Sequence, residues 1–226
     1  MIKEADCWLK GNCKQIHCDD PNGCMILFKL DYLYNEANVP INLRKKIDLK
    51  LDADGTDLKE FQQLKSIQDN IEDFVKNGDN LLIHSKTPGN GKTSWALRLL
   101  QTYFNRIWLK ATLNCHALFI NVPYFLIALK DNINEKNDYI QHINSNISSC
   151  DLVIWDDIGH KMGTDYEISN LLSMIESRII CNKSNIYTSN LTDQQLQTAL
   201  DGRLASRICN NSINIILNGG DKRGLH

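Results

Sequence analysis

The sequence lacks a strong net charge, a long apolar run and a recognisable secretion signal. Its 226 residues carry 25 Lys and Arg against 27 Asp and Glu, a net charge of −2, so any contact with nucleic acid must be local. The longest apolar stretch, residues 117–129, is interrupted by Asn121 and Pro123 and is too short to span a bilayer. Residues 1–6 lack the basic and apolar regions of a signal peptide. With no internal repeat and no low-complexity segment, we expect a soluble, cytoplasmic protein with no membrane partner.

Half of the cysteines are crowded near the amino terminus, at Cys7, Cys13, Cys18 and Cys24. In a reducing compartment, such crowding favours a metal site over disulfides. Four thiolates suit tetrahedral Zn²⁺, whose binding energy would fold a segment too short to have its own core. The spacing C-x5-C-x4-C-x5-C differs from the common C-x2-C pattern, so an iron–sulfur cluster, unligated thiols and substitution of one ligand by His17 stay open. The remaining cysteines are scattered and are expected to be small buried hydrophobic residues: Cys115, Cys150, Cys181 and Cys209.

A short apolar run at residues 81–83 precedes a glycine-containing loop and then a helix-like stretch at residues 95–103. This order is typical of a phosphate-binding loop, in which backbone N–H groups and a helix amino terminus face the phosphates. Lys92 would hold the β- and γ-phosphates of ATP, and Thr93 would hold Mg²⁺. The rest of the predicted binding loop consists of Pro88, Gly89, Asn90, Gly91 and Ser94. Lys86 stands where the usual pattern has its first glycine.

Residues 152–155 form a second apolar run, which ends in Asp156 and Asp157. Such a run suits a central parallel strand buried on both faces, and doubly wound sheets bind ligands at the carboxyl ends of their strands. We therefore expect Asp156 to contact Mg²⁺ through water and Asp157 to orient or deprotonate the attacking water.

Alternating strand and helix patterns over residues 57–226 predict a parallel sheet flanked by helices. The expected strands lie at residues 81–84, 117–122, 152–155, 185–189 and 213–217. Apolar residues at helical spacing predict one helix over residues 25–37 and another from Asp57 that closes at Gly78. Between them, a basic patch at Arg44, Lys45 and Lys46 leads into a linker-like segment. The domain prediction is a cysteine-rich module at 1–46, a linker at 47–56 and an α/β ATPase domain at 57–226.

The second half offers further candidates for the ATPase site. Asn190 follows the strand at 185–189, where its amide can position water against the γ-phosphate. Arg203 and Arg207 lie four residues apart on one helix face, and an arginine that reaches a neighbour's nucleotide is worth a factor of about 10³ to 10⁵ in rate. Exposed charged helix faces are ordinary, so a plain surface role stays open for these arginines.

Together these motifs resemble the bacterial and phage replicative-helicase loaders, a clade of the AAA+ ATPases that also includes transposon-associated ATPases. The resemblance covers residues 64 to 223 and depends on the order of five short segments, at 89–93, 155–159, 188–190, 206–208 and 220–223. It implies that Asn190 is the sensor-1 residue, Arg207 the arginine finger and Arg223 a sensor-2 arginine. It also implies self-association through the ATPase interface and a helical lid that is vestigial or absent.

The leading hypothesis from the sequence is an ATPase that binds a hexameric replicative DNA helicase through its amino-terminal module and places it on single-stranded DNA. Lys86 and the short Asp157, where the family usually has glutamate, imply slow hydrolysis. They also permit a non-catalytic adaptor that ATP only stabilises. A transposition ATPase is a further alternative, although its amino-terminal region should be larger. For DNA contacts, Tyr124, Phe125 and Lys130 are candidates, with packing of both aromatic residues in the core as the alternative.

Overall fold

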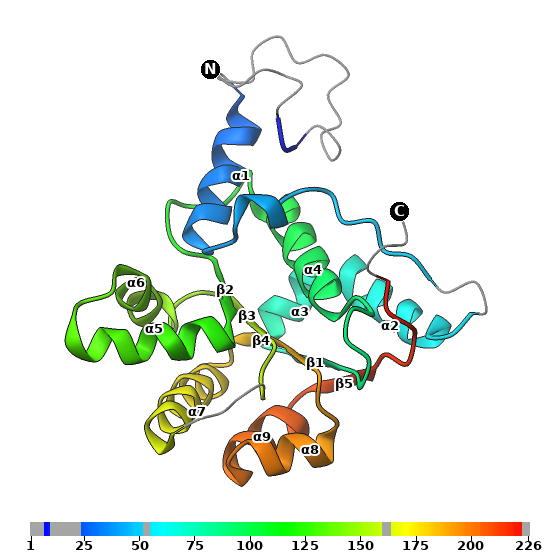
Figure 1. Ribbon diagram of the computed structural model, residues 1–226. Helices are drawn as coiled ribbons and strands as arrows, with labels where there is room; N and C mark the ends of the chain where they lie inside the picture. Colours follow the sequence, from blue (N-terminus) through cyan, green and yellow to red (C-terminus); the bar gives the residue numbers. More distant parts are fainter. Residues whose placement is uncertain (1–6, 10–23, 52–54, 160–163, 223–226) are drawn as a thin grey trace.

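The computed structural model describes residues 7–9, 24–51, 55–159 and 164–222 (Figure 1). In the first part of the chain the helices and strands are α1 (Met25–Glu36), the 3₁₀ turn η3 (Ile41–Leu43), α2 (Leu58–Asp69), α3 (Ile71–Asn77), β1 (Asn80–His84), α4 (Lys92–Ile107), β2 (Ala117–Asn121), α5 (Val122–Asn134) and α6 (Asp138–Asn146). They are followed by β3 (Leu152–Asp156), α7 (Asp165–Ile180), β4 (Ser184–Ser189), α8 (Asp193–Ala199), α9 (Gly202–Asn210) and β5 (Ile213–Ile216). All five expected strands are present within about two residues of their predicted bounds.

The five strands form one parallel sheet in the order β2-β3-β4-β1-β5. β4 therefore lies between β1 and β3, with Asn80 opposite Asn185 and Leu152 opposite Ser184. Every residue of β3 and β4 is buried. β3 is apolar up to Asp156, as a strand covered on both faces should be, whereas β4 also buries four polar residues, Ser184, Asn185, Thr188 and Ser189. The order places the strand before Asn190 beside the acidic strand β3.

Alternate side chains of the strands enter two hydrophobic cores, one on each face of the sheet. Leu81 and Ile154 join the core beneath helices α1 to α4, and Leu82 and Trp155 join the core beneath helices α5 to α9. Figure 1 shows these two helical layers on opposite sides of the sheet. The arrangement confirms the predicted α/β architecture with a parallel sheet flanked by helices.

Helix α1 shares a core with the sheet, although the sequence placed it in an amino-terminal module. Leu30 and Leu33 of α1 are buried in the same cluster as Leu81, and the Ala37 carbonyl accepts a hydrogen bond of 2.7 Å from the Phe119 N–H on edge strand β2. The proposed division of the chain at residues 46 and 56 stays a prediction.

Of the basic segment at residues 44–46, Arg44 is buried, whereas Lys45 and Lys46 are exposed. The Arg44 guanidinium pairs with Asp31 at 2.7 Å and donates to Asn35 and to the Val39 carbonyl. A buried guanidinium is retained only where its N–H groups are satisfied, and these contacts fix the chain after α1 against the helix.

The single helix expected from Asp57 to Gly78 is divided into α2 and α3 at Asn70. Asn70 leaves the helical conformation at φ −111° and ψ 29°, and its side chain donates to the Ser66 carbonyl. An asparagine amide that bonds the backbone competes with helix continuation. The predicted end of α3 is confirmed, because Gly78 adopts the left-handed conformation at φ 72°.

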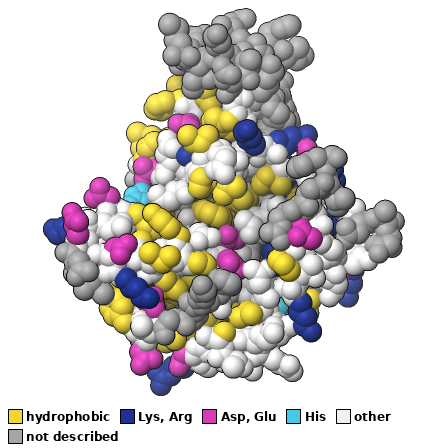
Figure 2. All heavy atoms as spheres, in the orientation of Figure 1, with side chains coloured by type: hydrophobic (Ala, Val, Ile, Leu, Met, Phe, Trp, Pro, Cys, Tyr) yellow, Lys and Arg dark blue, Asp and Glu magenta, His cyan; other side chains and the backbone are white. Residues whose placement is uncertain are grey.

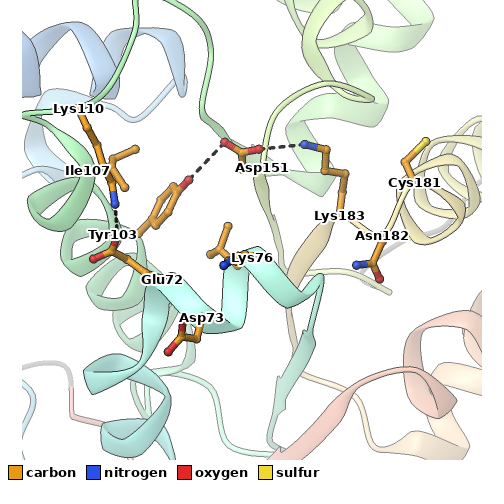
Figure 3. A pocket seen from close by; sticks show the side chains of 11 residues that line it. Glu72, Asp73, Lys76, Tyr103, Ile107, Lys110, Asp151, Cys181, Asn182 and Lys183 are labelled. Atoms are coloured by element: carbon orange, nitrogen blue, oxygen red, sulfur yellow. Dashed lines mark hydrogen bonds and ion pairs between the residues drawn. The ribbon is translucent and has the colours of Figure 1, made fainter.

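At the amino-terminal edge of the sheet, a carboxylate is held by three donors. Asp151, just before β3, accepts from Lys183 at 2.9 Å, His116 at 3.3 Å and Tyr103 at 3.4 Å. Asp151, Lys183 and Tyr103 border a cavity of about 630 Å³ between α3, α4 and the start of β4, where Figure 3 shows Tyr103 and Lys183 approaching Asp151 from opposite sides. The His116 hydrogen bond and the Lys183 ammonium, opposed by partial burial, hold the pKa of Asp151 down at about 2.

We predict that Asp151→Asn lowers the free energy of unfolding at pH 7. The folded pKa of about 2 lies below the ordinary value of 3.8, so Asp151 stabilises the fold above about pH 4, and this contribution is lost as the pH falls towards 2. Urea unfolding should show a shallower loss of stability over that pH range for the variant than for the wild type. Asp79→Asn, which removes an exposed carboxylate, is the control. Parallel pH profiles for wild type and Asp151→Asn would contradict this role.

Candidate nucleotide-binding site

The carboxyl ends of three neighbouring strands bring the candidate site together. β1 leads into the phosphate loop, β3 ends in Asp156, and β4 between them leads into Asn190. In open α/β sheets ligands bind at this edge, so the topology explains how segments far apart in sequence form one site.

The phosphate loop owes its shape to two glycines. Gly89 and Gly91 have φ values of 77° and 102°, in the left-handed region that a side chain disfavours. Gly91 is also the residue from which α4 begins, so the amino terminus of that helix opens directly onto the loop. Lys86, which replaces the usual first glycine, is exposed and does not have a positive φ. The loop therefore does not need glycine there for its backbone conformation.

Lys92 and Asn90 lie inside this loop. The Lys92 ammonium donates to the Thr87 carbonyl at 3.0 Å and to Asn90 Oδ1 at 3.1 Å. The Asn90 amide donates to the Leu217 carbonyl at 3.2 Å and to Ser85 Oγ. Asn90 thereby fastens the loop to the end of β5, a role that the loop pattern alone did not indicate.

Asp156 is the centre of a buried hydrogen-bond network. Its Oδ1 accepts from Thr93 Oγ1 at 2.7 Å and from Thr188 Oγ1 at 2.8 Å, and Asn121 Nδ2 lies 3.4 Å from Oδ2. Burial raises the pKa of Asp156, while the three hydrogen bonds act in the opposite direction. Thr188 and Asn121 were missed as site residues in the sequence, although Thr188 stands two residues before the predicted Asn190.

Asp157 and Asn190 also meet. Asn190 Nδ2 donates to Asp157 Oδ1 at 2.6 Å, and the Asp157 backbone N–H donates to Thr188 Oγ1 at 2.9 Å. Asp157 has a φ of 59°, which turns the chain sharply after β3. The two side chains predicted to act on water therefore lie side by side at the end of the sheet.

The oxygen ligands available here fit Mg²⁺. A hydroxyl and a carboxylate are the hard donors that Mg²⁺ takes alongside phosphate oxygens and water, and Thr93 and Asp156 present these groups within 2.7 Å of each other. Both lie next to the phosphate loop, since Thr93 is in the first turn of α4.

A cavity of about 530 Å³ adjoins the phosphate loop. It is lined by residues 84–87, by Thr192 and Gln194, and by residues 216–218. The segment after β5 bounds this region, because the Lys222 N–H donates to the Gly89 carbonyl and the Asp57 carboxylate accepts from the N–H groups of Asn218 and Gly219. In the described residues after β5 there is no helix, and Arg223 lies outside them.

Arg207 lies on α9, away from the network around Asp156. Its side chain is about half exposed, and Nε donates to Glu176 of α7 at 3.1 Å. Arg203, one turn earlier, is also exposed. The structure thus presents two surface arginines on α9, of which Arg207 is paired within the chain.

The predicted metal module is only partly described. Cys13 and Cys18 lie outside the described residues, and within the described part no group of three or more His, Cys, Asp or Glu side chains could hold a metal ion. Cys7 and Cys24 are half-buried against the core of α1, and the Cys24 sulfur accepts from the Leu27 N–H at 3.5 Å at the start of the helix. Of the scattered cysteines, Cys181 is exposed, contrary to the expectation of burial.

Of the three candidate DNA-contacting residues, one is buried in the core and two are exposed. Phe125 is fully buried, whereas Tyr124 is 56% exposed and stacks edge-on against Tyr139. Lys130 is exposed and pairs with Glu167 at 3.1 Å. On the face shown in Figure 2, the described Lys and Arg side chains are scattered among acidic ones.

Among the described residues, no helix is both long and apolar enough to cross a membrane.

No protein-family model matches this chain, and no curated protein matches its sequence. Solved structures are similar in fold. The DnaC helicase loader matches with a TM-score of 0.59 and 17% identity, over 74% of this chain and 92% of that one. DnaI matches with a TM-score of 0.60 and 19% identity, over 79% of this chain and 94% of that one. The replication initiator DnaA bound to AMPPCP and single-stranded DNA matches with a TM-score of 0.55 and 18% identity, over 72% of this chain and 46% of that one.

These similarities in fold agree with the resemblance to helicase loaders that the order of the sequence motifs indicated. The assignment of the individual site residues stays a prediction. By these similarities, the chain has the same fold as the DnaC helicase loader, DnaI and the replication initiator DnaA.

Proposed function

We propose that this protein is an ATP-dependent loader of the hexameric replicative DNA helicase onto single-stranded DNA. The observation that carries the proposal is the arrangement of Thr93, Asp156, Asp157 and Asn190 around one phosphate loop, in a fold similar to DnaC and DnaI. The cytoplasm is the compartment that this function requires.

Binding of Mg²⁺ and ATP would use groups that already face each other. The Lys92 ammonium would leave the Thr87 carbonyl and Asn90 for the β- and γ-phosphates, and Thr93 and Asp156 would hold Mg²⁺. The cavity beside residues 84–87 is large enough for the base and sugar. When bound, Mg²⁺ neutralises charge on the phosphates, and it would also offset the burial of the Asp156 carboxylate.

Hydrolysis would depend on Asp157 and Asn190. Their 2.6 Å contact holds the carboxylate at a fixed position, from which it can orient the attacking water. Aspartate is one methylene shorter than the usual glutamate, so we expect slow turnover. The same feature supports the second candidate, a non-catalytic adaptor in which ATP stabilises a helicase-binding surface.

Docking of the helicase is assigned to the amino-terminal module with its predicted Zn²⁺ at Cys7, Cys13, Cys18 and Cys24. Helix α1, which follows these cysteines, presents Met25 and Phe28 to solvent with more than 60% of each side chain exposed. Because Met25 and Phe28 lie one turn apart, they are on the same side of α1. They would extend the candidate docking surface from the amino-terminal module onto the ATPase core. Single-stranded DNA would stack on the exposed Tyr124 ring.

For the ATPase reaction, we predict that Asp157→Asn retains ATP binding and lowers turnover by about 10²-fold, because the Mg²⁺ ligand survives while the water-orienting carboxylate is lost. Asp156→Asn should instead weaken ATP binding in the presence of Mg²⁺. Turnover and nucleotide titration on the same samples separate the two effects. Equal turnover in wild type and Asp157→Asn would remove Asp157 from catalysis and favour the adaptor.

We predict that Arg207→Ala leaves ATP binding by the monomer intact and suppresses only the hydrolysis that depends on assembly, by about 10³-fold. A finger acts on the neighbouring subunit's nucleotide, and Arg207 must leave Glu176 to reach it. Turnover should therefore rise with protein concentration in the wild type but not in the variant. Arg203→Ala, on the same helix, is the matched control, and Glu176→Gln should not reduce the rate. A concentration-independent rate for the wild type would refute this assignment.

Helicase binding is tested by co-purification with the replicative helicase of the same cell. We predict that wild type forms a stable complex, and that Cys13→Ser loses both the complex and about one equivalent of metal while retaining ATP binding. An incomplete ligand shell forfeits much of the roughly 10–16 kcal/mol that structural Zn²⁺ contributes to folding. Cys181→Ser, at an exposed cysteine outside the module, is the control.

Two results would overturn parts of this assignment independently. Absence of zinc and iron from protein purified under reducing conditions would end the metal prediction. Absence of a helicase complex with metal-loaded wild type would end the loader proposal.

A further inference from the structure

Two thiols face each other at the amino-terminal edge of the sheet, opposite the nucleotide site. β2 pairs with β3 so that Ala117 lies opposite Leu152, and Cys115 and Cys150 each stand two residues before this pair, just outside the strands. The two thiols influence each other's pKa, and both belong to the core beneath helices α5 to α9, with Cys150 1% exposed and Cys115 8% exposed. Neighbouring strands lie about 4.8 Å apart, within the roughly 4.4–6.8 Å Cα separation that a disulfide spans.

A buried arginine holds one of these sulfurs. Arg178 of α7 is fully buried, and its Nη1 donates to Cys150 Sγ at 3.3 Å. Its other hydrogen bonds reach neutral groups, including the Ile147 and Ser184 carbonyls at 2.6 Å and Asn185 Oδ1 at 2.8 Å. Among its described hydrogen-bond partners, only the Cys150 sulfur can become an anion.

This environment makes the two sulfurs chemically unequal. Arginine stays protonated in proteins, and a buried cation is stabilised by an anionic partner. The neighbouring Cys115 thiol and the Arg178 charge lower the pKa of Cys150, against the effect of burial. The neighbouring Cys150 and burial raise the pKa of Cys115, whose Sγ donates to the Ala117 carbonyl at 3.2 Å. Cys150 is therefore the better nucleophile, and Cys115 keeps its proton.

We propose that Cys150 and Cys115 form a redox-active dithiol that hydrogen peroxide converts to an intramolecular disulfide. The oxidant is small and uncharged, and Cys115 is the more exposed member of the pair.

The reaction balances in two steps. The Cys150 thiolate attacks one peroxide oxygen, so an S–O bond forms, the O–O bond breaks, and the departing hydroxide takes a proton to become water. Cys115 sulfur then attacks Cys150 sulfur, and its proton goes to the leaving oxygen as the S–O bond breaks. Two thiols are oxidised to one disulfide, and one peroxide is reduced to two waters.

A chain of contacts connects this pair with the nucleotide site. Asn185 Oδ1 accepts from Arg178 Nε at 2.8 Å and from Trp155 Nε1 at 3.0 Å, and Trp155 directly precedes Asp156 in β3. Oxidation removes the anionic contact of Arg178 at the base of this strand.

The test is peroxide treatment of the reduced full chain, quenched by alkylation and followed by non-reducing peptide mapping. We expect a peptide pair joined through Cys115 and Cys150, lighter by two hydrogen atoms and separated again by dithiothreitol. Cys115→Ser should stop at the sulfenic acid of Cys150, which dimedone traps. Cys181→Ser, at an exposed thiol, should leave the yield of the joined pair unchanged.

Absence of the joined pair at a peroxide dose that oxidises the exposed Cys181 would overturn the proposal. A disulfide from Cys150 to any other cysteine would overturn it equally. Because the readout is mass, neither result depends on ATPase activity or helicase binding.

Discussion

The site depends on one buried carboxylate that three strands hold in common. Asp156 at the end of β3 accepts hydroxyl hydrogen bonds from Thr93, which follows β1, and from Thr188 of β4. These bonds require β4 to lie between β1 and β3, which is the observed order. The same Thr188 oxygen accepts from the Asp157 N–H, so the network also sets the turn that carries Asp157 to Asn190.

The aspartates at the two edges of the sheet, Asp151 and Asp156, have different surroundings. At the amino-terminal edge, Asp151 is satisfied by Lys183, His116 and Tyr103, and its pKa is low. At the carboxyl edge, the described hydrogen-bond donors to Asp156 are the neutral side chains of Thr93, Thr188 and Asn121, and burial raises the pKa of Asp156. A buried carboxylate without a cation costs stability, and a bound Mg²⁺ offsets that cost. Mg²⁺ bound as we propose would therefore offset the burial of the Asp156 carboxylate.

Much of the sheet and the loop could be predicted because local sequence determines them. Buried parallel strands read as apolar runs, and Gly89 and Gly91 are required by positive φ values. The missed features depend on contacts between distant segments. The buried guanidinium of Arg44 depends on its hydrogen bonds to Asp31 and Asn35 of α1, and Thr188 contributes to the site because Asp156 lies beside it. Neither contact can be seen in one stretch of sequence.

The central claim is that ATP bound with Mg²⁺ at Asp156 drives helicase loading. The most direct measurement is unwinding by the replicative helicase of a strand annealed to circular single-stranded DNA, which has no free end for the helicase to thread. The account predicts that wild type with ATP and Mg²⁺ stimulates unwinding strongly, and that Asp156→Asn does not. Equal unwinding with wild type, with Asp156→Asn and with helicase alone would contradict it.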